Sequence, residues 1–88
     1  MSETPEIRLK RLHMRSMRRG IKEMDLILSS FAQARLAGMG PEDLDLYEAL
    51  LHENDQELYA WINGQTAAQD RFAALVAEIS DHARTGLA

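Results

Sequence analysis

Residue types that could carry out chemistry are few in this sequence, and they are scattered. The three histidines, His13, His52 and His82, fall in three different predicted helices, and no pair has the one-turn spacing of a helical metal site. The chain has no cysteine, which excludes disulfides, thiolate metal sites and cysteine nucleophiles, and it has no glycine-rich nucleotide-binding loop. We therefore predict no catalytic residue, no metal site and no cofactor bound tightly by this chain.

If the chain were an enzyme, the remaining candidate for a catalytic group would be a histidine paired with a carboxylate from another helix. Acids are abundant, but groups such as Glu42-Asp43-Asp45 are typical of the charged starts of helices. A helical domain of 88 residues should also have little room for the pockets of about 300 Å³ or more that ligands usually occupy. We expect a protein that is not an enzyme.

One polar group has a more informative position. Arg19, Gly20 and Glu23 lie where a basic segment meets the start of an amphipathic helix. If the apolar face of that helix points inward, Glu23 leans outward in its first turn, within reach of Arg19. One interpretation is an ordinary surface ion pair, worth about 0–1 kcal/mol. The other is that Gly20 leaves bare backbone between two charges, which a partner protein can approach closely.

Five helices joined by short loops would position these residues. Apolar residues recur at steps of three and four, and glycine and proline mark the boundaries, so the predicted fold is all-α. We expect Thr4 to cap the first helix and Asp55 the fourth. In the fourth helix we expect Trp61 to anchor the core and Tyr59 to be half exposed. The predicted helices cover about residues 5 to 17–19, 21–36, 41–53, 55–62 and 67–84.

Length and composition indicate one helical domain across residues 1–88, with frayed ends at about 1–4 and 85–88. Hydrophobic residues make up 45% of the chain and charged residues 27%, as in ordinary folded proteins. No apolar run approaches the roughly 20 residues that span a bilayer. The first residues resemble neither a signal peptide nor a transit peptide. These absences lead us to expect a cytoplasmic protein of bacterial type.

The net charge of −4 hides a strong asymmetry. Residues 1–24 carry seven basic and three acidic side chains, whereas the remainder carries three basic and eleven acidic ones. The acidic remainder would repel a polyanion, so we expect the basic face to meet an acidic patch on a partner protein, with no binding to nucleic acid or membrane. The alternative is a small regulatory or antitoxin-like adaptor that binds another protein or nucleic acid through its basic first helix.

The Arg19 group also belongs to a longer pattern, in two blocks. The first block is Arg15-Ser16-x-x-Arg19-Gly20-x-x-Glu23-x-Asp25 followed by Leu26-x-Leu28-x-x-Phe31, and the second is Leu46-Tyr47-Glu48-Ala49-Leu50-Leu51, then Asp55, then Leu58-Tyr59-x-Trp61-x-x-Gly64. Together they resemble the signature of the SdhE-type succinate dehydrogenase assembly factors, in matching order over about residues 8–64. Met17 and Ile21 depart from that signature, where close relatives would carry Trp and Met, but both positions stay apolar.

This resemblance implies a small five-helix protein that binds the flavoprotein subunit of succinate dehydrogenase and promotes covalent attachment of FAD to one of its histidines. It implies fumarate reductase subunits as further clients. The family is understood to bind and order a client whose flavinylation is largely self-catalysed, so FAD is attached to the partner and is not held by the chain. The implied partner-binding residues are Arg15, Arg19, Gly20, Glu23 and Asp25, and we expect a monomer when the chain is free.

Overall fold

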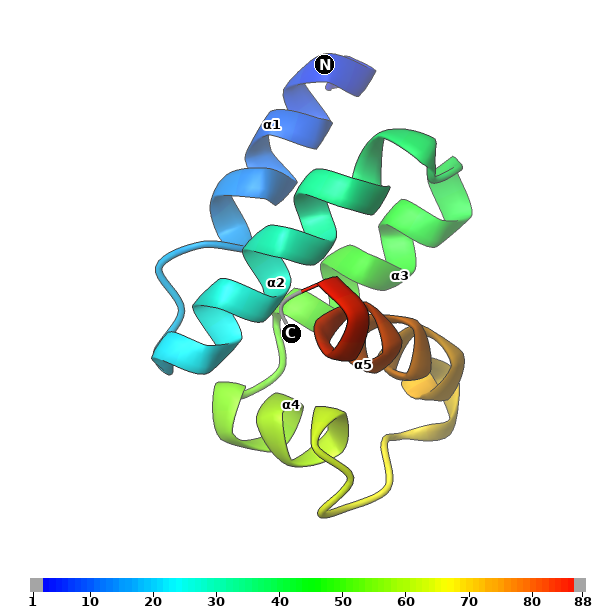
Figure 1. The fold of residues 1–88 in the computed structure, drawn as a ribbon. Coiled ribbons are helices and arrows are strands. Elements are labelled where there is room, and N and C mark those ends of the chain that lie inside the picture. Colours follow the sequence, from blue (N-terminus) through cyan, green and yellow to red (C-terminus); the bar gives the residue numbers. More distant parts are fainter. Residues whose placement is uncertain (1–2, 87–88) are drawn as a thin grey trace.

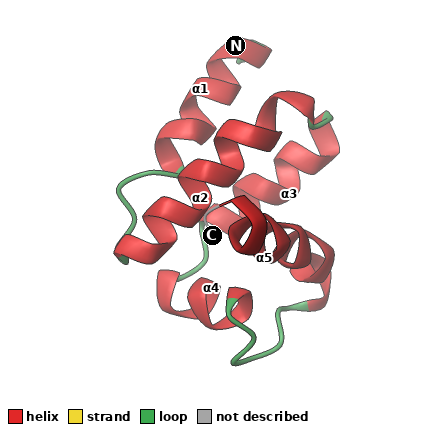
Figure 2. Ribbon diagram, in the orientation of Figure 1, coloured by secondary structure: helices red, strands yellow, loops and turns green. Residues whose placement is uncertain are grey.

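Five α-helices and two short 3-10 helices make up most of this computed structural model, which describes residues 3–86. Helix α2 lies at the centre and contacts α1, α4 and α5 (Figure 1). Loops are short, and residues 3–86 contain no strand (Figure 2). The α-helices are α1 (Pro5–Arg15), α2 (Lys22–Arg35), α3 (Pro41–Leu51), α4 (Asp55–Ile62) and α5 (Ala73–Gly86), and the 3-10 helices are Leu36–Gly38 and Asp70–Phe72. The predicted all-α bundle is confirmed.

Helix α1 starts as predicted and ends early. The Thr4 side chain accepts a hydrogen bond from the Ile7 amide at 3.2 Å, and Pro5 occupies the first turn. The helix ends at Arg15, before the expected range of 17–19, and Arg18 then adopts a left-handed backbone conformation with φ of 56°. Few residues other than glycine adopt that conformation, and it cannot continue a right-handed helix.

The start of α4 corrects the predicted cap. Asn54 is the N-cap, and its side chain accepts a hydrogen bond from the Gln56 amide at 2.8 Å. Asp55 follows as the first residue of the helix. Asparagine and aspartate can both cap a helix. Here Asn54 takes the cap position, and the Asp55 side chain does not bond to the backbone of α4. The Asp55 carboxylate is therefore free to bind another part of the chain.

The last helix begins later than the sequence pattern predicts. Residues 67–69 are not helical, and a 3-10 turn at Asp70–Phe72 precedes α5. This turn places Phe72 in the core, with its ring centroid 6.0 Å from that of Trp61. Packing of these two rings overrides the helix propensity of the preceding alanines. Trp61 is buried and Tyr59 is half-buried, as predicted.

A continuous apolar core joins the helices. Helix α2 contributes most of its inner face, α1 contributes only one fully buried apolar side chain, and Ile7, Met14 and Met17 are exposed. Buried core residues are Leu12, Met24, Leu28, Phe31, Ala32, Leu36, Tyr47, Leu50, Leu51, Leu58, Trp61, Ile62, Phe72, Leu75, Val76 and Ile79. Helix α1 therefore needs further contacts to hold its place.

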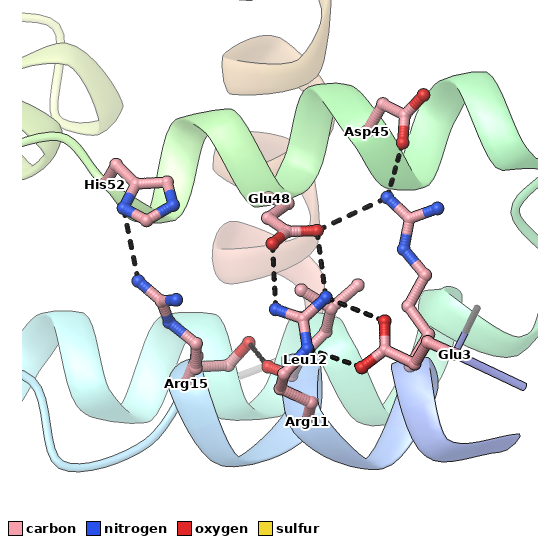
Figure 3. Close-up of polar contacts among 9 residues, drawn as sticks. Glu3, Arg11, Leu12, Arg15, Asp45, Glu48 and His52 are labelled. Carbon is pink, nitrogen blue, oxygen red and sulfur yellow. Dashed lines mark hydrogen bonds and ion pairs between the residues drawn. The ribbon is translucent and has the colours of Figure 1, made fainter. Parts of the chain in front are cut away.

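Those contacts are ionic. Arg11 of α1 donates to Glu48 of α3 at 2.8 Å and to Glu3 at 2.7 Å (Figure 3). Arg8 pairs with Asp45 of α3 at 2.5 Å. The Arg11 guanidinium lowers the pKa of Glu48 and of Glu3 below the ordinary value of a glutamate. Arginines of α1 thus bind α3 across a boundary that the apolar core covers only in part.

The predicted fraying of the ends falls partly outside the described residues, since residues 1–2 and 87–88 lie beyond them. Within the described chain, Glu3 is tied to Arg11, and Thr85 lies in α5, where its hydroxyl donates to the Asp81 carbonyl at 3.0 Å.

Candidate docking site

The segment between α1 and α2 is anchored at its start by a buried serine. The Ser16 hydroxyl lies 2.8 Å from the Leu12 carbonyl, to which it donates, and 2.6 Å from the Tyr47 hydroxyl. Ser16 is fully buried, and burial raises the pKa of Tyr47 to about 12. We call residues 16–21 the docking loop. Its backbone turns at Arg18 and is extended at Ile21, which is the N-cap of α2.

The Arg19 side chain is mostly buried and binds groups within the chain. Its Nε donates to Asp55 Oδ1 at 2.9 Å, its Nη1 donates to the Arg15 carbonyl at 2.9 Å, and its Nη2 donates to the Leu51 carbonyl at 3.0 Å. Only 11% of the side chain is exposed. The expected pairing of Arg19 with Glu23 is wrong, because the Arg19 guanidinium binds Asp55 and the Leu51 carbonyl at the junction of α3 and α4.

Gly20 binds the same carboxylate. Its amide donates to Asp55 Oδ2 at 2.6 Å, and a Cβ added at this position would lie 3.1 Å from that oxygen. The fold therefore favours glycine at this position, because a side chain would crowd the Asp55 oxygen that accepts from the Gly20 amide. Gly20 is exposed, but its N–H already donates to Asp55. The expectation that a partner can approach open backbone at Gly20 therefore excludes this N–H group.

The other predicted residues divide into two groups. Arg15 joins the docking loop, since its carbonyl accepts from Arg19 and its Nη2 lies 3.2 Å from His52 Nδ1 (Figure 3). Glu23 and Asp25 lie in the first turn of α2; Glu23 is exposed, whereas Asp25 is half-buried and accepts from the Ser29 hydroxyl at 3.2 Å. The structure therefore joins Arg19 and Gly20 to Asp55, connects Arg15 to them through Arg19, and leaves Glu23 facing solvent.

Sequence reasoning missed several residues around the loop. Met17 is 49% exposed and Leu26 is 57% exposed, beside the exposed charges of Arg18 and Lys22. A hollow of about 160 Å³ adjoins Met17 between α1 and α2. For Leu26, the available signal was its place outside the repeat of buried residues Met24, Leu28 and Phe31 in α2. Exposed apolar side chains rimmed by charge are typical of a protein-binding surface.

The histidines give no sign of a catalytic site. His13 lies in α1, His52 follows α3, and His82 lies in α5, where its Nε2 is 2.8 Å from the Ser30 hydroxyl. The polar partners found for them are Arg15 and Ser30, so the one enzymatic route that the sequence left open, a histidine–carboxylate pair, gains no support within residues 3–86. Among the same residues no group of three or more possible metal-ligating side chains occurs. No helix in the described part of the chain is long and apolar enough to cross a membrane.

The expectation about pockets is wrong. A surface hollow of about 560 Å³ lies between the end of α4, the segment that follows it, and α5. Its charged lining residues, Asp81 and Arg84, are paired with each other. Small helical bundles can leave such hollows where a loop, rather than a helix, covers a helix–helix boundary. The hollow is separate from the docking loop, and its lining includes no histidine.

Comparison with known proteins gives a consistent result. The sequence model of a family described as flavinator of succinate dehydrogenase matches residues 10–83. A protein of Debaryomyces hansenii is 44% identical over 59 residues, which are 67% of this chain and 42% of that protein. A protein of Candida glabrata is 44% identical over 62 residues, 70% of this chain and 40% of that protein. Both are named succinate dehydrogenase assembly factor 2, mitochondrial.

These comparisons contradict the expected location. The fungal relatives are named as mitochondrial proteins, so the prediction of a bacterial-type cytoplasmic protein is wrong. That prediction was based on the absence of a targeting segment. The chain spans about two fifths of the length of the curated relatives it matches, so such an absence says nothing about the compartment.

The match covers the docking loop, Asp55 and all of the helices except residues 5–9 of α1 and residues 84–86 of α5. It also agrees with the resemblance found in the two sequence blocks, which lie entirely inside residues 10–83. The family is one of assembly factors and is not a known family of catalytic enzymes. The chain belongs to the family of flavinators of succinate dehydrogenase.

Proposed function

We propose that this chain binds the flavoprotein subunit of succinate dehydrogenase and promotes the covalent attachment of FAD to it. The observation that carries the proposal is the family match over residues 10–83, which includes the docking loop with Arg19 and Gly20 and the exposed Glu23. Fumarate reductase subunits, as related flavoproteins, are further candidate clients. FAD belongs to the partner in this proposal, and the chain contributes a binding surface.

The docking site is built on the five residues named from the sequence. Arg15, Arg19 and Gly20 act through the shape of the loop, because their polar groups are used inside the chain. Glu23 acts by contact, since it is exposed in the first turn of α2, and Asp25 supports that turn through Ser29. Exposed Met17 and Leu26, and the hollow of about 160 Å³ beside Met17, supply apolar contact.

Binding alone can promote the reaction. If the client attaches its own flavin in one of its conformations, a factor that favours that conformation by about 1.4 kcal/mol raises its population ratio tenfold. A standard interface takes about 800 Å² from each partner. The chain exposes 5652 Å², so an interface of that size would use only a minor part of its surface.

The adaptor alternative loses its main support. Arg8 and Arg11, which made the first helix basic, are paired with acids of α3, and Arg19 is paired with Asp55. Neutralised guanidiniums release few counterions from a nucleic acid. The exposed bases that remain near the loop, such as Arg18 and Lys22, lie beside the acid Glu23, which suits a protein partner better than a polyanion.

The test is covalent flavin content in cells. The chain is co-expressed with the apo flavoprotein subunit, and flavin fluorescence is read in a denaturing gel. Glu23→Ala should lower the fluorescence of the subunit well below that seen with wild type. Glu42→Ala is the matched control, because Glu42 is also exposed and also the second residue of a helix. Equal fluorescence with and without the wild-type chain would refute the proposed function.

A further inference from the structure

Asp55 lies at the centre of the docking site, although it is remote from it in sequence. We propose that Asp55 is the positioning residue of the docking loop, and that Arg19 acts through Asp55 rather than by touching the partner. This inference rests on the proposed function for its effect on the client. Its structural part concerns the free chain alone and is tested separately.

Both oxygens of the Asp55 carboxylate are used by the loop. Oδ1 lies 2.9 Å from Arg19 Nε and 2.8 Å from Arg19 Nη2, and Oδ2 accepts from the Gly20 amide at 2.6 Å. The two residues it binds are adjacent in the chain and 35 or 36 positions away from it. A single carboxylate thus fixes the direction of the Arg19 side chain and the orientation of the following peptide plane.

Arg19 extends this connection to two more elements. Its Nη1 donates to the carbonyl of Arg15 at the end of α1, and its Nη2 donates to the carbonyl of Leu51 at the end of α3. Arginine can satisfy several acceptors at fixed angles because its guanidinium is a planar fork of donors. The ends of α1 and α3 and the start of α4 are therefore joined at one side chain that solvent barely reaches.

Because the Arg19 guanidinium is largely buried, it requires the Asp55 carboxylate as its counter-charge. The exposed fractions of the Arg19 and Asp55 side chains are 11% and 17%, so loss of Asp55 would leave a largely buried guanidinium without its counter-charge. Asp55 itself is favoured at the first position of α4, where the helix dipole stabilises an anion. Arg18 holds an uncommon left-handed conformation immediately before Arg19, and such conformations persist only where surrounding contacts enforce them.

The consequence for binding follows from pre-organisation. With the carboxylate in place, the loop presents exposed Met17 and Arg18 in one arrangement. Without it, only a fraction of molecules hold that arrangement, and the measured Kd rises by the inverse of that fraction. Asn at position 55 could still accept one hydrogen bond but carries no charge, so Asp55→Asn should have a smaller effect than Asp55→Ala.

The structural part is tested by amide hydrogen exchange of Gly20 in the free chain, measured by NMR. In Asp55→Ala the exchange of the Gly20 amide should accelerate at least about tenfold more than that of the Leu28 amide in the middle of α2, since only Gly20 loses its acceptor. Asp55→Asn should lie between the two. Unchanged exchange at Gly20 in Asp55→Ala would overturn the inference, whatever the chain binds. A common acceleration at Gly20 and Leu28 would also overturn it, because it would show a general loss of stability.

The functional part is a double-mutant cycle on the Kd for the apo flavoprotein subunit. Arg19→Ala and Asp55→Ala should each weaken binding about tenfold, and the double variant should be no weaker than either single one, because the two residues act as one unit. Losses that multiply to about a hundredfold would show that Arg19 has its own contact with the partner and would overturn the inference. Glu48→Gln is the matched control, a partly buried carboxylate that also binds an α1 arginine, and it should leave the Kd unchanged.

The two kinds of failure are distinguishable. If the wild-type chain does not bind the subunit, the proposed function fails, but the exchange rates of Gly20 still decide whether Asp55 holds the loop. If the wild-type chain binds and the cycle is additive, the proposed function stands and the assignment of Asp55 is wrong.

Discussion

At the scale of single residues, Gly20 is restricted by its own hydrogen bond. A Cβ there would lie 3.1 Å from Asp55 Oδ2, so a bulky residue must displace either the carboxylate or the loop. We predict that Gly20→Val weakens binding to the flavoprotein subunit about tenfold or more, with helix content close to wild type. Far-UV circular dichroism and a Kd measurement check this. Gly38→Ala is the control, because nothing lies within 4 Å of its added Cβ. Unfolding of Gly20→Val would instead assign the glycine a role in stability.

A second prediction at this scale concerns the pH dependence of stability that Tyr47 causes. Burial raises its pKa from the ordinary 10.0 to about 12, so the folded chain keeps the phenol neutral at a pH where the unfolded chain loses the proton. The stability associated with Tyr47 is therefore complete below about pH 10 and is lost as the pH rises toward about 12. Tyr47→Phe should cost about 1 kcal/mol at neutral pH, because Ser16 loses a partner, and should remove part of the alkaline loss.

Urea unfolding of wild type and Tyr47→Phe at about pH 7, 10 and 11 measures both effects. The free energies of unfolding of the two proteins should converge as the pH rises. Parallel losses would mean that Tyr47 does not titrate as its burial implies. Tyr59→Phe is the comparison variant, since Tyr59 is only half-buried.

At the scale of elements, the sequence predicted the existence of all five α-helices, but neither 3-10 helix and not every boundary. Helix α2 differs from its predicted range by one residue at each end, because its apolar face is nearly continuous. Helix α5 starts later than predicted, since Phe72 must reach Trp61, a contact that no local pattern contains. Asn54 caps α4 in place of Asp55, because Asp55 is bound by a distant loop. Local patterns fail where a tertiary contact decides.

The ion pairs between α1 and α3 predict an acid dependence. The Arg11 guanidinium lowers the pKa of Glu48 below the ordinary 4.5, so this carboxylate stabilises the fold above that pH, and the contribution is lost as the pH falls through the lowered value. Glu48→Gln should cost about 1 kcal/mol or less at neutral pH. Its difference from wild type in free energy of unfolding should shrink as the pH falls to about 3.

Chemical denaturation across this pH range is the measurement, with Glu57→Gln as a control that removes an exposed acid. A difference between wild type and Glu48→Gln that stays constant with pH would show that the α1–α3 contact does not depend on the charge of Glu48.

At the scale of the whole molecule, the charge asymmetry of the sequence is resolved by the fold. Bases of residues 1–24 lie against acids of α3 and α4, so much of the basic segment is neutralised within the chain. The sequence could not show this, since the paired residues are 36 to 40 positions apart. It did identify Arg19, Gly20 and Glu23 as one group. It could not show that Asp55 joins the first two and that Glu23 stays outside.

At this scale we propose that a small helical chain promotes flavin attachment by presenting one ordered docking surface to its partner. The most direct test uses purified components, so that no other cellular factor contributes. Apo flavoprotein subunit is incubated with FAD and with wild-type chain, Glu23→Ala, Asp55→Ala or no chain, and covalent flavin is read after denaturation. We predict more covalent flavin with the wild-type chain than with no chain, and a clear loss with both variants. Covalent flavin that is the same with wild type as with no chain would contradict it.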